Sequence, residues 1–202
     1  MKKIIILLAV FLSFKANGQT YMNIFKSDGN VLSIPLSTID SITYTTTPIL
    51  YVGYNYQGGI VAYLLKPGDP GYDPNIQHGL ITAPTDTFGA WGCYGTLIGG
   101  TDTIIGSGLN NSNLIAAKCT NSAAKLCLDF VRNGFGDWYL PSKKEFEKIY
   151  ENKVIVGLDL NYAYWTSSEV TLHTAWMKAN VGTPWLDRIK NYSTKIRPIR
   201  KF

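Results

Sequence analysis

The late part of the sequence, between Tyr162 and Tyr192, is rich in side chains that could bind a ligand. Aromatic rings offer flat surfaces for stacking, and arginine can form paired hydrogen bonds to a sulfate or a carboxylate. The turn-forming residues of GTPWLDRIKN place Trp185 and Arg188 in a segment where exposure is expected. These residue types favour binding over catalysis. The candidate ligand-binding residues are Tyr162, His173, Trp185, Asp187, Arg188, Lys190 and Tyr192.

Other side chains in the same region have simpler structural explanations. Trp165 and Trp176 alternate with polar residues in strand-like segments, so we expect them in the core. Arg197 and Arg200 could form internal ion pairs. These four residues are therefore left out of the candidate site.

Catalysis is a weaker alternative. A polymer hydrolase would need two carboxyl groups about 5 to 10 Å apart across one cleft. Ser122 and Lys125 match the Ser-x-x-Lys of serine acylases, but the Ser-Asp-Asn and Lys-Thr-Gly elements that accompany it are absent. Because Ser122 precedes a helical pattern, we expect it to cap a helix. We therefore expect no catalytic residue. The acids that a hydrolase could use are Asp137, Asp159, Glu169 and Asp187.

Metal and nucleotide sites are not indicated. The two histidines, His78 and His173, lie far apart in loops, and no cysteine–histidine cluster has ligand spacing. The segment GGTDTIIGSG resembles a phosphate-binding loop, but no Gly-Lys-Ser/Thr follows it. We expect no cofactor and no metal.

The stretch GDWYLPSKKEFEKIY carries many reactive side chains, yet each has a structural explanation. Ser142 and Glu145 form the Ser-x-x-Glu pattern of a capping box, so a helix is predicted over 143–152. Pro141 keeps the preceding residue extended, and Asp137 is expected to fix a turn after Gly136. A second helix is predicted over 122–133, and the chain between 89 and 113 is expected to be irregular.

The N-terminal residues predict export. Lys2 and Lys3 precede a short apolar run, and a small-x-small site ends at Gly18, so residues 1–18 are read as a signal peptide. No cysteine follows for a lipid anchor, and we expect no membrane span. The predicted location is secreted or cell-surface.

Three cysteines in an exported chain predict one disulfide. Cys127 falls on the apolar face of the helix predicted over 122–133, which favours a buried thiol. The favoured pair is Cys93 and Cys119, and the alternative is Cys119 and Cys127.

The mature chain divides into a short segment over 19–47 and a domain over 48–202. In the short segment, Asp28-Gly29 between two apolar runs predicts a β-hairpin, which is too small to be stable alone. Basic residues gather late, because residues 141–202 contain eleven lysines and arginines against six acids. A partner could therefore be anionic.

Several short motifs give a resemblance. GGIVAYLL, WGCYGT, GDWYLPSKKEFEKIY, YWTSSE and IRPIRKF occur in the order found in the Lcl C-terminal domain family, which the chain resembles from about Tyr56 to Phe202. The resemblance implies an α+β C-type lectin-like domain with two helices and small antiparallel sheets, whose late loops present a ligand surface. Related domains occur in exported adhesins, some of which recognise sulfated glycans.

Two departures limit what the resemblance implies. Nothing after Cys127 is a cysteine, so the cysteine pair of formylglycine-generating enzymes is missing. The calcium-dependent sugar motifs Glu-Pro-Asn, Gln-Pro-Asp and Trp-Asn-Asp are also absent.

The predicted function is an exported, non-catalytic, adhesin-like module that binds a carbohydrate or protein without calcium. The alternatives are a structural subunit that assembles with copies of itself and, less favoured, a hydrolase. A nucleic-acid partner is not expected, because the sequence contains no recognisable nucleic-acid-binding motif.

Overall fold

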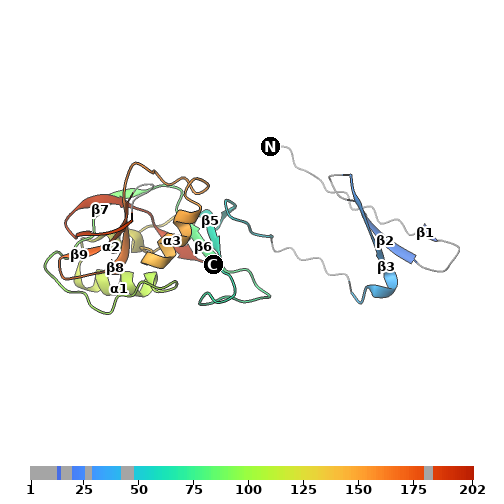
Figure 1. Ribbon diagram of the computed structural model, residues 1–202, viewed down its shortest axis with the longest axis horizontal. Helices are drawn as coiled ribbons and strands as arrows, with labels where there is room; N and C mark the ends of the chain where they lie inside the picture. The colour runs from blue at the N-terminus through green and yellow to red at the C-terminus, as the bar shows by residue number, and fades with distance from the viewer. Residues whose placement is uncertain (1–12, 15–19, 26–28, 42–47, 180–183) are drawn as a thin grey trace. The chain divides into compact units, whose positions relative to one another are not determined.

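The computed structural model describes residues 13–14, 20–25, 29–41, 48–179 and 184–202 (Figure 1). The chain divides into two units, Met1–Pro48 and Ile49–Phe202. Most of the predicted signal peptide lies outside the described residues, as does Asp28 of the predicted turn.

The described residues of the smaller unit form an antiparallel sheet with the strand order β1-β2-β3. β2 and β3 pair from Tyr21↔Pro35 to Phe25↔Val31, and Gly29, which precedes β3, has a φ of +83°. No side chain described in this unit is buried. Its elements are β1 (Ser13–Phe14), β2 (Thr20–Phe25), β3 (Val31–Pro35) and the 3-10 helix η1 (Leu36–Thr38).

The larger unit contains a five-stranded sheet with the order β10-β9-β8-β11-β7. Its strands are antiparallel neighbours except β11 and β8, which pair in parallel through Lys195↔Tyr164. The strands are β7 (Thr87–Ala90), β8 (Tyr164–Glu169), β9 (Thr174–Lys178), β10 (Trp185–Ile189) and β11 (Ser193–Ile196).

A four-stranded antiparallel sheet completes the larger unit, with the order β12-β6-β5-β4. Pro198 cannot donate a ladder hydrogen bond, and it separates β11 from the last strand, so the end of the chain enters both sheets. The strands are β4 (Asn55–Tyr56), β5 (Gly59–Leu64), β6 (Gly79–Thr82) and β12 (Ile199–Lys201).

Three short α-helices lie in the described part of the larger unit, and no helix among the described residues is long and apolar enough to cross a membrane. α3 packs against β5 and β6 of one sheet and β8 and β9 of the other, while α1 packs on α2 and β8 (Figure 1). The helices are α1 (Gly108–Lys118), α2 (Ala123–Leu128) and α3 (Lys143–Glu151).

Tryptophan dominates the core of the larger unit. Trp91, Trp138 and Trp165 are fully buried, and each indole N–H donates to a backbone carbonyl. A buried indole needs such a partner, because an unpaired donor in the interior costs about 1 to 3 kcal/mol. Trp165 is thus a core residue, as the alternation predicts, while Trp176 is only half-buried.

The two late arginines are structural. Arg197 pairs with Asp86 and donates to the carbonyls of Val156 and Gly157. Arg200 makes a bidentate pair with Asp137, at 2.6 and 2.8 Å. Asp137 therefore anchors the C-terminal strand to the loop before Trp138, whereas the turn expected after Gly136 is not formed and the nearest turn lies earlier, at Asn133 and Gly134.

Cys93 and Cys119 form a disulfide, the pair favoured from the sequence, with their Cα atoms 5.7 Å apart. Cys127 is a buried free thiol on α2, and burial raises its pKa.

The expected α+β C-type lectin-like domain with two helices and small antiparallel sheets is wrong. The described residues are mostly β, with twelve strands in three sheets and three short α-helices, and one sheet contains a parallel pair. α1 falls partly in the stretch expected to be irregular. The helix predicted over 122–133 ends at Leu128 with Asp129 as its C-cap, and the rest of the predicted range contains a turn through Asn133 (φ +51°) and Gly134 (φ +82°) that bridges Arg132 to Phe135.

Candidate functional site

The start of α3 fixes the position of the first lysine in the candidate site. Ser142 accepts from the backbone N–H of Glu145, and Glu145 accepts from the N–H of Ser142 over 2.8 Å. The N–H of Lys143 donates to Ser168 on β8, at 3.1 Å. The predicted capping box therefore begins the helix at Lys143 and ties this residue to the five-stranded sheet.

The pairing of β9 with β10 gathers aromatic and charged side chains on one face of that sheet. Trp185 lies opposite Lys178, and Asp187 lies opposite Trp176. Residues two apart on a strand share a face, and directly opposite residues do as well. These four side chains therefore stand on the same face, and Trp185 also packs against the cluster that contains Phe146 of α3.

Lysines and aromatic rings alternate across this face. The Lys143 ammonium lies 3.4 Å from the ring centroid of Trp176 and 5.2 Å from that of Trp185. Lys178 lies 5.6 Å from the ring of Trp185 and 4.9 Å from that of Tyr150. Lys153 also lies over Tyr150, at 5.2 Å. We call this set the lysine–aromatic face, and it consists of Lys143, Tyr150, Lys153, Trp176, Lys178 and Trp185.

The electrostatics of the lysine–aromatic face suit an anion. Burial lowers the pKa of Lys143; Glu147 opposes this effect and Lys144 adds to it. A partly desolvated ammonium interacts more strongly with an anion than a fully hydrated one, because the effective dielectric constant is lower. Asp187 is the acid that the strand register places on this face.

The structure separates the residues predicted for the site. Trp185 and Asp187 lie on the lysine–aromatic face, whereas Arg188 is opposite Ala175 on the other side of β10. The Arg188 guanidinium lies 4.9 Å from the ring centroid of Tyr192, and both residues are exposed.

Two further predicted residues lie at other places. The exposed His173 ring is 5.0 Å from the ring of Tyr94. Tyr162 is exposed beside Phe88, with their ring centroids 6.3 Å apart, and Lys195 lies over the Tyr162 ring. The seven predicted residues thus do not form a single site.

Lys190 is buried and cannot contact a ligand at the surface. Its ammonium donates to Glu169 over 2.6 Å and to the carbonyl of Thr96 over 2.9 Å, and lies over the ring of Trp91. Burial acts to raise the pKa of Glu169, but Lys190 and the N–H groups of Ile98 and Gly99 lower it overall.

The acids considered for a hydrolase are mostly paired with cations. Asp137 binds Arg200, Glu169 binds Lys190, and Asp159 lies 3.4 Å from Lys195. No group of three or more His, Cys, Asp or Glu in the described part of the chain could hold a metal ion. Three of the four acids considered for a hydrolase therefore have structural partners in the described part of the chain.

The three lysines of the lysine–aromatic face were not predicted from the sequence. Lys143 and Lys153 belong to it only because α3 packs on the sheet, which no local pattern reveals. Lys178 could have been found, since the period-2 pattern of TAWMK places it two residues from Trp176 on one face.

Comparisons with known proteins give a match among solved structures but none among family models. No protein-family model matches the chain, and no curated protein matches it. Among solved structures, a fimbrial protein from Bacteroides ovatus ATCC 8483 is similar, with a TM-score of 0.56 and 15 % identity. The match covers 92 % of this chain but only 57 % of that one. At this identity the likeness concerns the fold alone.

Proposed function

We propose that the chain is a non-catalytic, adhesin-like module of a bacterial surface that binds an anionic glycan through the lysine–aromatic face, without calcium. The observation that carries the proposal is the placement of Lys143 against both Trp176 and Trp185. Ammonium groups suit sulfates and carboxylates, and indole rings suit the apolar faces of sugars.

The surface location has independent support. The fold is similar to that of a fimbrial protein, and the first 18 residues have the pattern of a signal peptide. Membership in the Lcl C-terminal domain family stays a prediction.

The test is binding of the mature protein to an array of sulfated, uronic-acid and neutral glycans. Replacing Trp176 and Trp185 together by Ala should weaken binding by roughly tenfold or more, which corresponds to about 1.4 kcal/mol. Lys143→Gln with Lys178→Gln should remove the preference for anionic glycans. The matched control is Lys125→Gln on α2, a lysine that pairs with Asp129 outside this face. Equal binding by all variants would reject the proposed site.

An assembly subunit is the second candidate. No described side chain of the smaller unit is buried, and Phe25, Val31 and Leu32 are exposed in its sheet. A sheet of this size needs a packed face for stability. If another copy supplies that face, sedimentation should show oligomers that disappear when residues 19–47 are removed. Unchanged sedimentation would exclude this role for the segment.

A further inference from the structure

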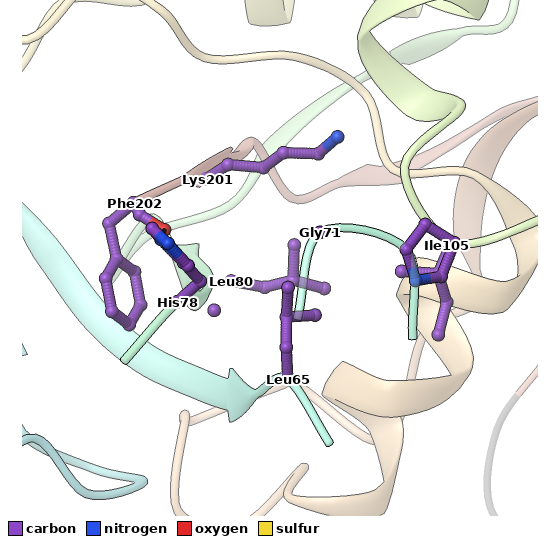
Figure 2. A pocket seen from close by; sticks show the side chains of 9 residues that line it. Leu65, Gly71, His78, Leu80, Ile105, Lys201 and Phe202 are labelled. Atoms are coloured by element: carbon purple, nitrogen blue, oxygen red, sulfur yellow. Dashed lines mark hydrogen bonds between the residues drawn. The ribbon is translucent and has the colours of Figure 1, made fainter. Parts of the chain in front are cut away.

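A small hollow lies in the larger unit, beside the ends of β5, β6 and β12. Its volume is about 160 Å³. Figure 2 shows Lys201 crossing above it, His78 and Phe202 on one side, and Ile105 on the other. None of the lining residues belongs to the lysine–aromatic face. The hollow is lined by Leu65, Pro70, Gly71, His78, Gly79, Leu80, Ile105, Lys201 and Phe202.

Backbone pairing builds one wall of this hollow. The N–H of Phe202 donates to the carbonyl of Gly79 over 3.2 Å, and the Phe202 carbonyl lies 3.1 Å from Nδ1 of His78. A Cβ atom at Gly79 would lie 2.8 Å from the Phe202 ring, which is closer than real Cβ contacts. Glycine at this position therefore allows the ring to lie against the strand.

The interior of the hollow is apolar and of molecular size. Leu65, Leu80, Ile105 and Phe202 contribute apolar side chains to the lining. An engineered cavity of about 150 Å³ lined by similar side chains holds one benzene molecule. This hollow can therefore take one phenyl ring or one branched aliphatic group.

A lysine at the rim provides a positive charge. The exposed Lys201 ammonium donates to the carbonyl of Gly106 over 3.1 Å. A Cβ atom at Gly106 would lie 3.4 Å from this nitrogen, so the ammonium lies close to the backbone of Gly106, and Lys201 is one of the residues that line the hollow. An ammonium has three donors, and this bond uses one of them.

The carboxylate of Glu145, which interacts electrostatically with Lys201, is held by other groups. It accepts from the N–H groups of Ser142 and Gly106 and from the hydroxyl of Tyr139. The side chain is completely buried. Lys201 can therefore receive a second anion from solvent.

We propose that this hollow binds a small carboxylic acid that carries a phenyl or branched aliphatic group. The apolar group fills the space between Leu65, Leu80 and Ile105, and the carboxylate accepts hydrogen bonds from Lys201. This site is separate from the lysine–aromatic face and does not depend on it.

The test is a titration of the full mature protein with phenylacetate and 4-methylpentanoate, in which calorimetry measures the affinity and amide chemical shifts locate the bound acid. Both acids should bind, and shifts should concentrate at Gly71, Gly79 and Phe202. The matched alcohols, 2-phenylethanol and 4-methylpentanol, should bind at least about tenfold more weakly. Equal binding of acids and alcohols, or no binding of either acid, would overturn the proposal.

Two variants and one control separate the contribution of the Lys201 charge to binding from that of the apolar cavity. Lys201→Met keeps the apolar stem and should reduce acid binding to the level of the alcohols. Ile105→Trp should fill the hollow and abolish binding of both classes, with circular dichroism confirming the fold. Lys118→Met is the control, because Lys118 also donates to backbone carbonyls, those of Leu97 and Ile98, and does not line the hollow. A loss of binding in the control equal to that in Lys201→Met would also overturn the assignment.

Discussion

Lys190 and Glu169 form an ion pair of 2.6 Å in which the two side chains are 0 % and 5 % exposed. The pair joins the turn after β10 to β8, and the Lys190 ammonium also holds the carbonyl of Thr96. Lys190, which was predicted to bind a ligand at the surface, is thus a buried structural residue.

The first prediction concerns this buried pair. Lys190→Met should destabilise the protein by about 3 to 5 kcal/mol, because it leaves the Glu169 carboxylate buried without its cation. The double variant Lys190→Met/Glu169→Leu should recover much of that loss. Urea unfolding of the wild type and the two variants measures both effects. A single variant as stable as the wild type would show that the pair is not formed.

The second prediction concerns acid. The pKa of Glu169 in the folded chain lies below its ordinary value of 4.5, so the unfolded chain binds more protons near that pH. The stability that Glu169 contributes is therefore present above pH 4.5 and lost as the pH falls through its folded pKa. Asp137, whose pKa Arg200 lowers, acts in the same direction, whereas burial raises the pKa of Glu145, which acts in the opposite one.

Unfolding free energies measured from about pH 6 down to about pH 3 test whether the contribution of Glu169 to stability is lost as the pH falls. Glu169→Gln should be less stable at the upper end and should lose less stability on acidification than the wild type. A parallel pH dependence of the two proteins would contradict the assignment to Glu169.

The third prediction concerns the capping box of α3. Ser142→Ala removes the acceptor for the Glu145 N–H and also the donor to the carbonyl of Ile104, 2.7 Å away. The cost should be at least about 1 kcal/mol, the typical loss for an N-cap serine. Ser142→Asp keeps the acceptor for the Glu145 N–H but removes the donor to Ile104. Comparing the thermal unfolding of the two variants therefore separates the contribution of the helix cap from that of the hydrogen bond to the Ile104 carbonyl. A Ser142→Ala protein with unchanged stability would contradict this role.

Local chemistry explains what the sequence could predict. The helix from Lys143 was predicted because its cap and its apolar stripe lie within a few residues, and Ser142 and Glu145 make the predicted bonds. The stretch GTPWLDRIKN was read as a loop, although Trp185–Ile189 forms an edge strand. Its strand conformation depends on pairing with β9, and residues far apart in sequence supply that information.

Helix α1 shows the same limit. Gly108, Asn111 and their neighbours have low helix propensity, so no helix was predicted there. Tertiary contacts stabilise it, because Asn111 donates to the carbonyl of Asp102 over 2.7 Å and Ser112 to that of Leu140 over 3.2 Å. A Cβ at Gly108 would lie 2.7 Å from the Tyr139 ring, so glycine is needed for this packing.

The fourth prediction concerns the lysine–aromatic face and salt. If Lys143 and Lys178 contact an anionic glycan, binding should weaken as salt rises, because added salt screens the attraction between exposed charges more strongly. Lys143→Gln should lower both the affinity and its salt dependence, while Trp176→Ala should lower the affinity and leave the salt dependence nearly unchanged. Affinities for one sulfated glycan at several salt concentrations measure the two quantities separately. If both variants changed the salt dependence equally, the assignment of the charge interaction to Lys143 and of stacking to Trp176 would be wrong.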